Sequence, residues 1–423
     1  MKSVSILLLP LLLCAAAHAA EAPPALAFRP VAGTVMPMGG SVRDDNERVR
    51  QRLVQLAGGA EARFVVIPTS SSRPEATGMD AVEQLRRRGA KAELLKIAPR
   101  WDGETLESAR RAAADPANVA RIRAATAVFF TGGAQERTVD VLNPGGVASP
   151  VLQAVRELQA RGGVIAGSSA GAAIMSSTMF RDALNPLQVM KGVMRDGKEI
   201  DRGLGFAGDQ LFIDQHFLKR GRVGRMLALM LAQGYKVGLG VDENTAAIIH
   251  GSEIEIVGGS GALLLDLRQA IQEAGPVNVR NVRLSYLDNG DRYDLGTLKG
   301  QVLAAKQARG ELKFRQPGFN LELENIRPAY TDILGENAIL RALTQLVAGP
   351  RDQVRGLAFD LEQFPDAEIA DPAPELGFEF MLRRDEQTRG WDSAGLDDND
   401  YSIFDARLDV RPVRLKMPFY QAW

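Results

Sequence analysis

The chain has 423 residues, which is enough for one large domain with an addition or for two domains. Its formal net charge is -1, so it offers no broad basic surface for nucleic acid or for an anionic membrane. Hydrophobic residues make up 45% and charged residues 24% of the chain, as in an ordinary globular protein.

Residues 1–19 have the pattern of a cleaved export signal. Lys2 precedes an apolar stretch at 4–17, and the sequence AHA at 17–19 fits a signal-peptidase site. The apolar stretch is shorter than the roughly 20 residues that span a bilayer, which disfavours a membrane anchor. We therefore expect a secreted protein. The single cysteine, Cys14, lies inside this segment, so we expect the mature chain to have no disulfide, thiol nucleophile or cysteine metal ligand.

Short apolar runs alternate with helical patterns between about residues 30 and 250. The runs are rich in β-branched or aromatic residues and end in small polar ones, which predicts βαβ units and a mostly parallel sheet covered by helices on both faces. In such sheets, ligands bind at the carboxyl ends of the strands. The expected strands are 33–40, 63–70, 92–97, 126–133 and 162–171, and the expected helices are 46–57, 75–88, 104–113 and 148–161.

The later part of the chain carries fewer signals. Residues 252–269 indicate a hairpin-like continuation of the sheet, and we place the end of a catalytic α/β domain, spanning 27–297, near Thr297. Residues 298–423 are interpreted as an appended α+β module of unknown role, without a motif of recognisable chemistry. Within it we expect a helix near 337–347 and strands at 377–383 and 402–416.

The sequence GSSAG at 167–171 matches a G-x-S-x-G turn between a strand and a helix. Such a turn projects the Ser169 hydroxyl above the sheet and places the Ala170 amide at a helix N-terminus, where it favours an oxyanion. A second amide is expected from Gly132 or Gly133, because glycine lets the backbone approach a ligand closely. The alternative is that both segments are ordinary turns of small residues.

A nucleophilic serine needs a base, and histidine is the usual one near neutral pH. The chain has three histidines. His18 leaves with the export signal and His250 is interpreted as a surface residue, so His216 is the candidate base; a structural role for it is the alternative. A carboxylate should orient the imidazole. Residues 242–243, directly after an apolar run, supply Asp242 and Glu243, of which we favour Glu243 and keep Asp242 open.

Four basic residues follow the candidate base within a short stretch: Lys219, Arg220, Arg222 and Arg225. Arginine forks match carboxylates bidentately, so the cluster indicates a substrate that carries several carboxylates. On a helix, positions 222 and 225 would share a face. The alternative interpretation is a solvated helix face.

Four motifs together resemble one family of serine hydrolases. They are FFTGGAQ, GSSAGAAIMS, DQHFLKRGRVGRM and GVDENTAAI, which occur in the family's order within residues 33–297. This family contains cyanophycinase and the aspartyl dipeptidase peptidase E. The resemblance implies a three-layer α/β sandwich similar to class I glutamine amidotransferases, usually dimeric. It also implies cleavage of cyanophycin, a poly-aspartate with arginine joined to each β-carboxyl, into β-aspartyl-arginine dipeptides.

The resemblance also implies roles for single residues. Ser169 would be the nucleophile, His216 the general base and Glu243 the orienting acid, and we expect the amides of Gly133 and Ala170 to hold the oxyanion. The residues that match the family's substrate pocket are Gln135, Asp214, Gln215, Arg220, Arg222 and Arg225. No metal or organic cofactor is implied. Two alternatives remain: a peptidase-E-like enzyme for short aspartyl peptides, and a secreted binding protein without catalysis.

Overall fold

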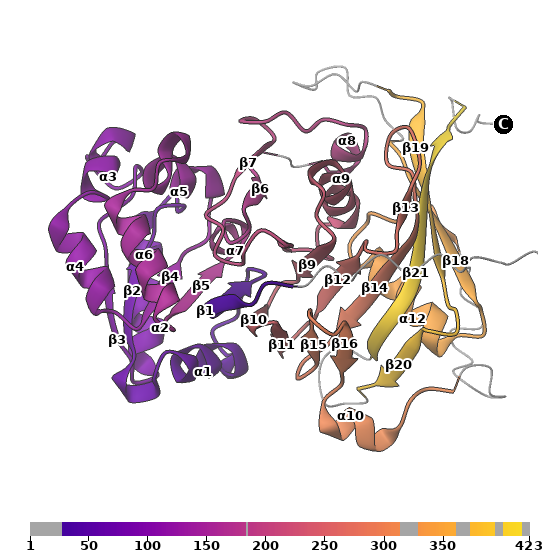
Figure 1. The fold of residues 1–423 in the computed structure, drawn as a ribbon, viewed down its shortest axis with the longest axis horizontal. Coiled ribbons are helices and arrows are strands. Elements are labelled where there is room, and N and C mark those ends of the chain that lie inside the picture. Colours follow the sequence, from indigo (N-terminus) through magenta and orange to yellow (C-terminus); the bar gives the residue numbers. More distant parts are fainter. Residues whose placement is uncertain (1–27, 183–184, 314–328, 361–372, 394–400, 417–423) are drawn as a thin grey trace, which may run out of the picture.

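The computed structural model describes residues 28–182, 185–313, 329–360, 373–393 and 401–416. Two large β-sheets run through the molecule (Figure 1). One is built from strands between residues 31 and 301, and the other from strands between residues 211 and 414. The expected export signal, residues 1–19, lies outside the described residues.

The first sheet has nine strands in the order β16-β15-β11-β10-β1-β5-β4-β2-β3. The strands from β1 to β3 along this order are parallel, as the alternating pattern predicts, and the other four extend the sheet antiparallel. The bounds are β1 (Val31–Met38), β2 (Arg63–Ile67), β3 (Lys91–Leu94), β4 (Ala127–Phe130), β5 (Val164–Ser168), β10 (Thr245–Gly251), β11 (Glu253–Gly258), β15 (Arg292–Asp294) and β16 (Lys299–Gln301).

Helices cover both faces of the parallel strands and give the α/β architecture three layers. On one face, Leu53 and Leu85 from α1 and α2 pack against Phe64 of β2. On the other face, Ile122 and Leu152 from α4 and α6 belong to a second core with the alternate residues of the same strands. The bounds are α1 (Glu47–Leu56), α2 (Pro74–Arg87), α3 (Leu106–Ala112), α4 (Pro116–Ala124), α5 (Gln135–Leu142) and α6 (Pro150–Ala160), with short 3₁₀ turns η1 (Gly59–Glu61) and η2 (Pro144–Gly146).

Local sequence fixes where several of these helices begin. The side chains of Asn46, Asp115 and Ser149 accept hydrogen bonds from first-turn amides, and α4 and α6 each start with proline. The sequence analysis did not predict α4 or α5. Helix α4 has only nine residues and follows α3 closely, so its apolar positions form too short a pattern to separate the two.

The second sheet has ten strands, with the path β17-β18-β19-β21-β14-β12-β9-β8, while β13 pairs with β14 and β20 with β21. Its two faces bury alternate residues: Ile213 of β8 joins the core shared with the first sheet, and Phe212 joins a core under α9 and α12. The bounds are β8 (Leu211–Gln215), β9 (Val237–Val241), β12 (Ala262–Asp266), β13 (Ile271–Gln272), β14 (Val279–Leu287), β17 (Ala329–Tyr330), β18 (Gln353–Ala358), β19 (Leu376–Arg383), β20 (Arg389–Asp392) and β21 (Tyr401–Arg414).

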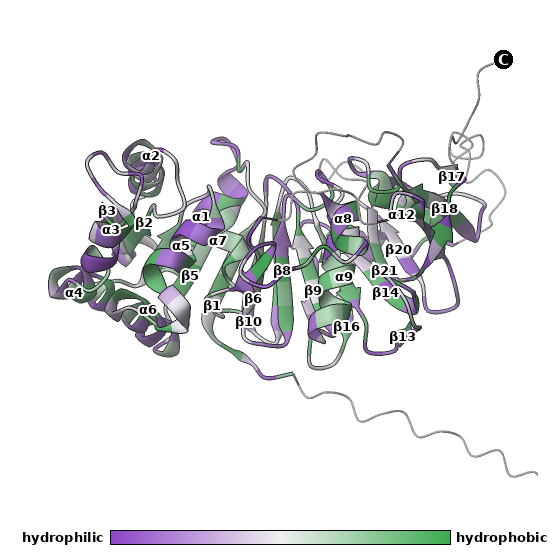
Figure 2. Ribbon diagram, turned by 90° about the horizontal axis from the view of Figure 1, so that it is seen from above, coloured by the Kyte–Doolittle hydropathy of each residue, from purple (hydrophilic) through white to green (hydrophobic). Residues whose placement is uncertain are grey.

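The remaining elements lie around this sheet. Figure 2 shows apolar residues along β8 and α9 and polar stretches on α1. A two-stranded sheet of β6 (Thr178–Phe180) and β7 (Ile200–Arg202) lies beside strand β8 of the second sheet. The helices are α7 (Ala170–Ala173), α8 (Pro186–Met190), α9 (Val223–Gln233), α10 (Ala304–Arg309) and α12 (Ala338–Ala348). Among the helices of the described ranges, none has the length and apolar character needed to cross a bilayer.

The C-terminal segment continues both sheets instead of standing apart. Strand β14 pairs with β21, and β15 pairs with β16 across residue 297, where Asp294 faces Lys299. The division predicted at 297 therefore falls in the turn of the hairpin formed by β15 and β16. The expected hairpin at 252–269 is wrong: β11 and β12 form there, but they belong to different sheets. The expected C-terminal helix and the two expected strands correspond to α12, β19 and β21.

Candidate active site

Ser169, the predicted nucleophile, occupies the turn between β5 and α7. Its φ of 53° and ψ of -111° are strained for a residue with a Cβ, as is usual in a nucleophile turn. The Ser169 amide donates to the Met38 carbonyl at 3.0 Å, which ties the turn to β1. A Cβ at Gly167 would lie 2.4 Å from the Gly171 carbonyl oxygen, so the glycines of the motif are required by close backbone packing.

A chain of two hydrogen bonds joins the predicted nucleophile, base and acid. Ser169 Oγ lies 2.8 Å from His216 Nε2, and His216 Nδ1 lies 2.6 Å from Glu243 Oε1. The three side chains come from the ends of β5, β8 and β9, which belong to both large sheets. This is the geometry of a serine-type catalytic triad.

The surroundings of His216 favour its neutral form. Burial lowers the pKa of His216 most, and the positive charge of Arg220 lowers it further. The hydrogen bond from Glu243 acts in the opposite direction and raises the pKa, without cancelling the effect of burial. An imidazole with a lowered pKa is unprotonated near neutral pH and can accept a proton from the serine.

Backbone contacts fix the ring of His216. The residue has a positive φ of 46°, and its amide donates to the Gly39 carbonyl at 2.8 Å. A Cβ at Gly40 would lie 2.3 Å from His216 Cε1, so only glycine leaves room for the ring there. The loop after β1 is therefore shaped around the imidazole, a role that the sequence analysis did not assign to it.

Of the two carboxylates left open by the sequence, Glu243 is the one that contacts His216. Asp242 is buried, and its Oδ1 accepts a hydrogen bond from the Lys219 amide at 3.2 Å. Burial also raises the pKa of Asp242. Asp242 therefore holds the loop that follows His216 and does not orient the ring itself.

Asn46 and Asn244 form a contact that the sequence analysis missed. Asn244 has a φ of 56° and directly follows Glu243. Asn46 Nδ2 donates to both the backbone and the side-chain oxygen of Asn244, each at 2.8 Å. The Asn244 amide in turn donates to the Gly40 carbonyl at 2.9 Å. These bonds hold the segment that carries Glu243 against the loop after β1, which also contacts His216. In the sequence, the only sign of this contact is that the loop is polar.

The two amides predicted for the oxyanion hole lie in the segments that surround the serine. Ala170 is the first residue of α7, and Gly133, with φ 141°, follows β4. Neither amide donates a hydrogen bond to another residue in the described part of the chain. A Cβ at Gly132 would lie 3.3 Å from Ser169 Cβ, so the glycine loop passes directly beside the serine. Free N–H groups in such positions can stabilise an oxyanion.

The predicted arginine cluster divides into a buried part and an exposed part. Arg225 is buried and donates twice to Asp214, at 2.8 and 2.6 Å, with its guanidinium over the ring of Phe180. Arg222 is also buried, lies 3.5 Å from Asp214 and donates to the Gln215 carbonyl at 2.7 Å. Burial lowers the pKa of Arg222 to about 9, which leaves it charged at neutral pH.

This arrangement corrects the expectation of a basic helix face that presents Arg222 and Arg225 to a substrate. Helix α9 begins only at Val223, and turns precede it. The two guanidinium groups compensate the buried Asp214, because an unpaired buried carboxylate costs several kcal/mol. Arg220, in contrast, is exposed.

The two predicted glutamines lie near these charges. Gln135 starts α5, and its Nε2 donates to the Phe180 carbonyl at 2.7 Å. Gln215 ends β8, and its Oε1 is buried without a hydrogen-bond partner among the described residues. Within the described ranges, no group of three or more His, Cys, Asp or Glu side chains is arranged to hold a metal ion.

Comparison with known proteins shows that the part of the chain that forms this site matches a known protein family. The model of Peptidase family S51 matches residues 35–257, which include Ser169, His216 and Glu243. The chain is 30% identical to a cyanophycinase of Synechococcus elongatus over 278 residues, covering 63% of this chain and 80% of that protein. It is 28% identical to a cyanophycinase of Geminocystis herdmanii over 275 residues, covering 62% and 94%.

Similarity to solved structures is weaker. A peptidase from an acI-B1 actinobacterium aligns with a TM-score of 0.45 and 20% identity, over 62% of this chain and 97% of that one. A peptidase E protein from Listeria monocytogenes, described as putative in its title, aligns with a TM-score of 0.36 and 15% identity, over 54% and 98%.

Proposed function

Because the chain belongs to peptidase family S51 and is a serine-type peptidase, we propose that it hydrolyses cyanophycin to β-aspartyl-arginine dipeptides through an acyl-enzyme. The observation that carries this proposal is the hydrogen-bonded series from Ser169 through His216 to Glu243. The cyanophycinases among its relatives supply the substrate class.

In the proposed mechanism, Ser169 Oγ attacks a backbone aspartyl carbonyl while His216 Nε2 takes its proton. Glu243 stabilises the imidazolium that forms. The amides of Gly133 and Ala170 hold the oxyanion, and His216 then protonates the leaving amine. Water hydrolyses the ester on Ser169 with His216 as base again.

The proposed substrate contacts rest on one exposed charge and on one polar atom without a hydrogen-bond partner among the described residues. Arg220 can reach a carboxylate of the polymer, because it lies at the surface one turn beyond His216. The unpartnered Oε1 of Gln215 offers an acceptor to an N–H of the substrate. We assign Arg222, Arg225 and Asp214 to the support of this pocket, and Gln135 to the wall beside Phe180.

Three further parts of the proposal concern the whole protein. We infer export directed by residues 1–19, assembly into homodimers, and a fold related to class I glutamine amidotransferases, which the parallel strands and the serine turn after β5 support. N-terminal sequencing of the secreted protein tests the export. Sedimentation at two protein concentrations tests the assembly into homodimers.

The central experiment is incubation of the protein with purified cyanophycin and mass spectrometry of the products. We expect β-aspartyl-arginine, and we expect Ser169→Ala to lower its release by at least ~10³-fold without unfolding the protein. Ser252→Ala, which removes a hydroxyl far from the site in a turn beside Asp294, is the matched control and should stay active. Full activity of Ser169→Ala would exclude the nucleophile assignment, and cleavage of short aspartyl peptides alone would indicate a peptidase-E-like enzyme.

A further inference from the structure

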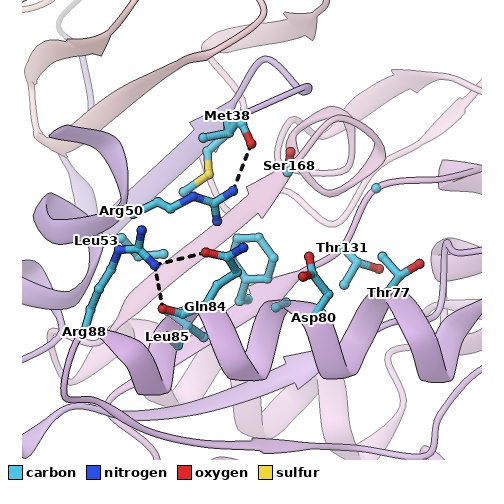
Figure 3. Close-up of a pocket in the computed structure, with 14 residues that line it drawn as sticks. Met38, Arg50, Leu53, Thr77, Asp80, Gln84, Leu85, Arg88, Thr131 and Ser168 are labelled. Carbon is cyan, nitrogen blue, oxygen red and sulfur yellow. Dashed lines mark hydrogen bonds between the residues drawn. The ribbon is translucent and has the colours of Figure 1, made fainter. Parts of the chain in front are cut away.

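A hollow lies beside the serine turn, on the face of the sheet covered by α1 and α2 (Figure 3). Its volume is about 160 Å³. A cavity of roughly 150 Å³ accommodates a ligand of the size of benzene. Apolar side chains line part of it, and its inner end reaches the residues next to Ser169. The lining residues include Met38, Leu53, Leu85, Phe129, Gly132 and Ser168.

The charges around this hollow do not cancel completely. Arg50 pairs with Asp44 at 3.1 Å and donates to the Val42 carbonyl at 2.8 Å. Arg88 pairs with Glu47. Asp80, on the exposed side of α2, forms no hydrogen bond or ion pair with another residue in the part of the chain that the structure describes, although its charge acts on Arg50 and raises the pKa of that guanidinium. One carboxylate therefore remains available to a cation.

Hydroxyl groups surround this carboxylate. Thr131 is only 2% exposed, and its Oγ1 has no hydrogen-bond partner among the described residues. In Figure 3, the side chains of Asp80, Thr77 and Thr131 lie together at one end of the hollow. A buried hydroxyl without a partner is costly, so a ligand that donates hydrogen bonds would satisfy it. The Ser168 hydroxyl, farther along the wall, accepts no bond within the described ranges either.

The combination of an apolar wall and a free carboxylate with hydroxyl acceptors fits a guanidinium group on a short aliphatic stem. The stem would lie against Phe129, and the planar N–H groups would reach Asp80 and Thr131. A purely anionic ligand would face the unpaired charge of Asp80, and a purely apolar one would leave Thr131 unsatisfied.

We propose that this hollow binds the arginine side chain of a polymer residue next to the scissile bond. The proposal rests on the proposed function, because an arginine branch follows from cyanophycin as substrate. Its position next to Ser169 supports the assignment: Gly132 lines both the hollow and the serine, with a Cβ there 3.3 Å from Ser169 Cβ. The hollow would thus select for arginine on the polymer, while the triad cleaves its backbone.

Binding can be tested without turnover. The probe is Nα-acetyl-L-arginine, and its control is Nα-acetyl-L-citrulline, which has an uncharged urea in place of the guanidinium. By calorimetric titration, we expect the arginine compound to bind the wild-type protein at least roughly tenfold more tightly than the citrulline compound. Asp80→Asn should remove this difference. Glu83→Gln, an exposed carboxylate on the same helix that does not line the hollow, should keep it.

Thr131→Val gives a second, nearly isosteric variant and should also weaken binding of the arginine compound. Absence of binding by the wild-type protein, or equal binding by Asp80→Asn, would overturn the proposal. So would an equal loss in Glu83→Gln.

Turnover separates this proposal from the proposed function. With cyanophycin as substrate, Asp80→Asn should raise KM more than it lowers kcat, and Glu83→Gln should change neither. If the wild-type protein binds the arginine compound through Asp80 but does not cleave cyanophycin, the proposed function fails and the binding site stands. If it cleaves cyanophycin with a KM that is independent of Asp80, the binding site fails and the function stands.

Discussion

Replacement of Glu243 by glutamine tests the assignment of the orienting acid. Glu243 Oε1 accepts a 2.6 Å hydrogen bond from His216, while the neighbouring Asp242 binds a backbone amide and does not touch the ring. Glu243→Gln and Asp242→Asn each remove one carboxylate charge with little change in shape. The pair therefore separates the two carboxylates between which the sequence could not decide.

The expected loss follows from the strength of this bond. A hydrogen bond to a charged group contributes about 1.5–3 kcal/mol, which corresponds to roughly 10- to 150-fold in rate as the imidazolium forms. The amide of glutamine can also stabilise the wrong tautomer, and this raises the expected loss in kcat to as much as ~10⁴-fold. Asp242→Asn should cost far less, because an asparagine oxygen can still accept the Lys219 amide.

The pH dependence gives an independent readout. His216 acts as a base only when unprotonated, so activity is lost as the pH falls through its pKa. Burial lowers this pKa, so the acid limb of kcat/KM should lie below the ordinary imidazole value of about 6.5. Because Glu243 raises the pKa, Glu243→Gln should shift the limb to still lower pH. The assay is initial-rate dipeptide release between pH 4 and 9. A larger loss in folded Asp242→Asn than in Glu243→Gln would refute the assignment.

The remaining predictions concern charged side chains beyond the triad. Arg225→Gln leaves Asp214 buried without its two-pronged partner, so the free energy of unfolding in urea should fall by about 3–5 kcal/mol. Exposed Arg220→Gln should keep that stability and weaken polymer hydrolysis; equal stability of the two variants would contradict the structural role. Lys306→Met should cost a similar amount, about 3–5 kcal/mol, because this buried ammonium is paired with two buried aspartates. Differential scanning calorimetry measures this loss of stability. The exposed Lys299→Met variant is the control and should melt at the same temperature as the wild type.

The sequence was most informative where one residue type is rare. With three histidines in the chain, one of them in the expected export signal, His216 could be selected without knowledge of the fold. The serine was recognisable because the strained turn needs small residues on both sides of Ser169. The parallel strands could also be predicted from the sequence, because each is a short apolar run with a helix after it.

The sequence was least informative about contacts between distant segments. The arginine run after His216 is visible as charge, but the burial of Arg225 depends on Asp214 at the end of β8 and on turns that delay the start of α9. Likewise, apolar alternation predicts both β11 and β12, yet neither run encodes its partner strand. The carboxylate of Asp80 lies in no motif, and Thr131, which lies beside it in the hollow, comes from the loop after β4.

The C-terminal segment shows how a region without a motif can still belong to the site. The Asn337 amide donates to the Leu218 carbonyl at 2.9 Å, and Glu336 forms an ion pair with Lys219. Both contacts are made to the loop directly after His216. That loop starts from a residue with positive φ, a conformation that persists only when its surroundings impose it. The C-terminal segment therefore helps to position the base, and its strands belong to the same sheet as β8, which ends one residue before His216.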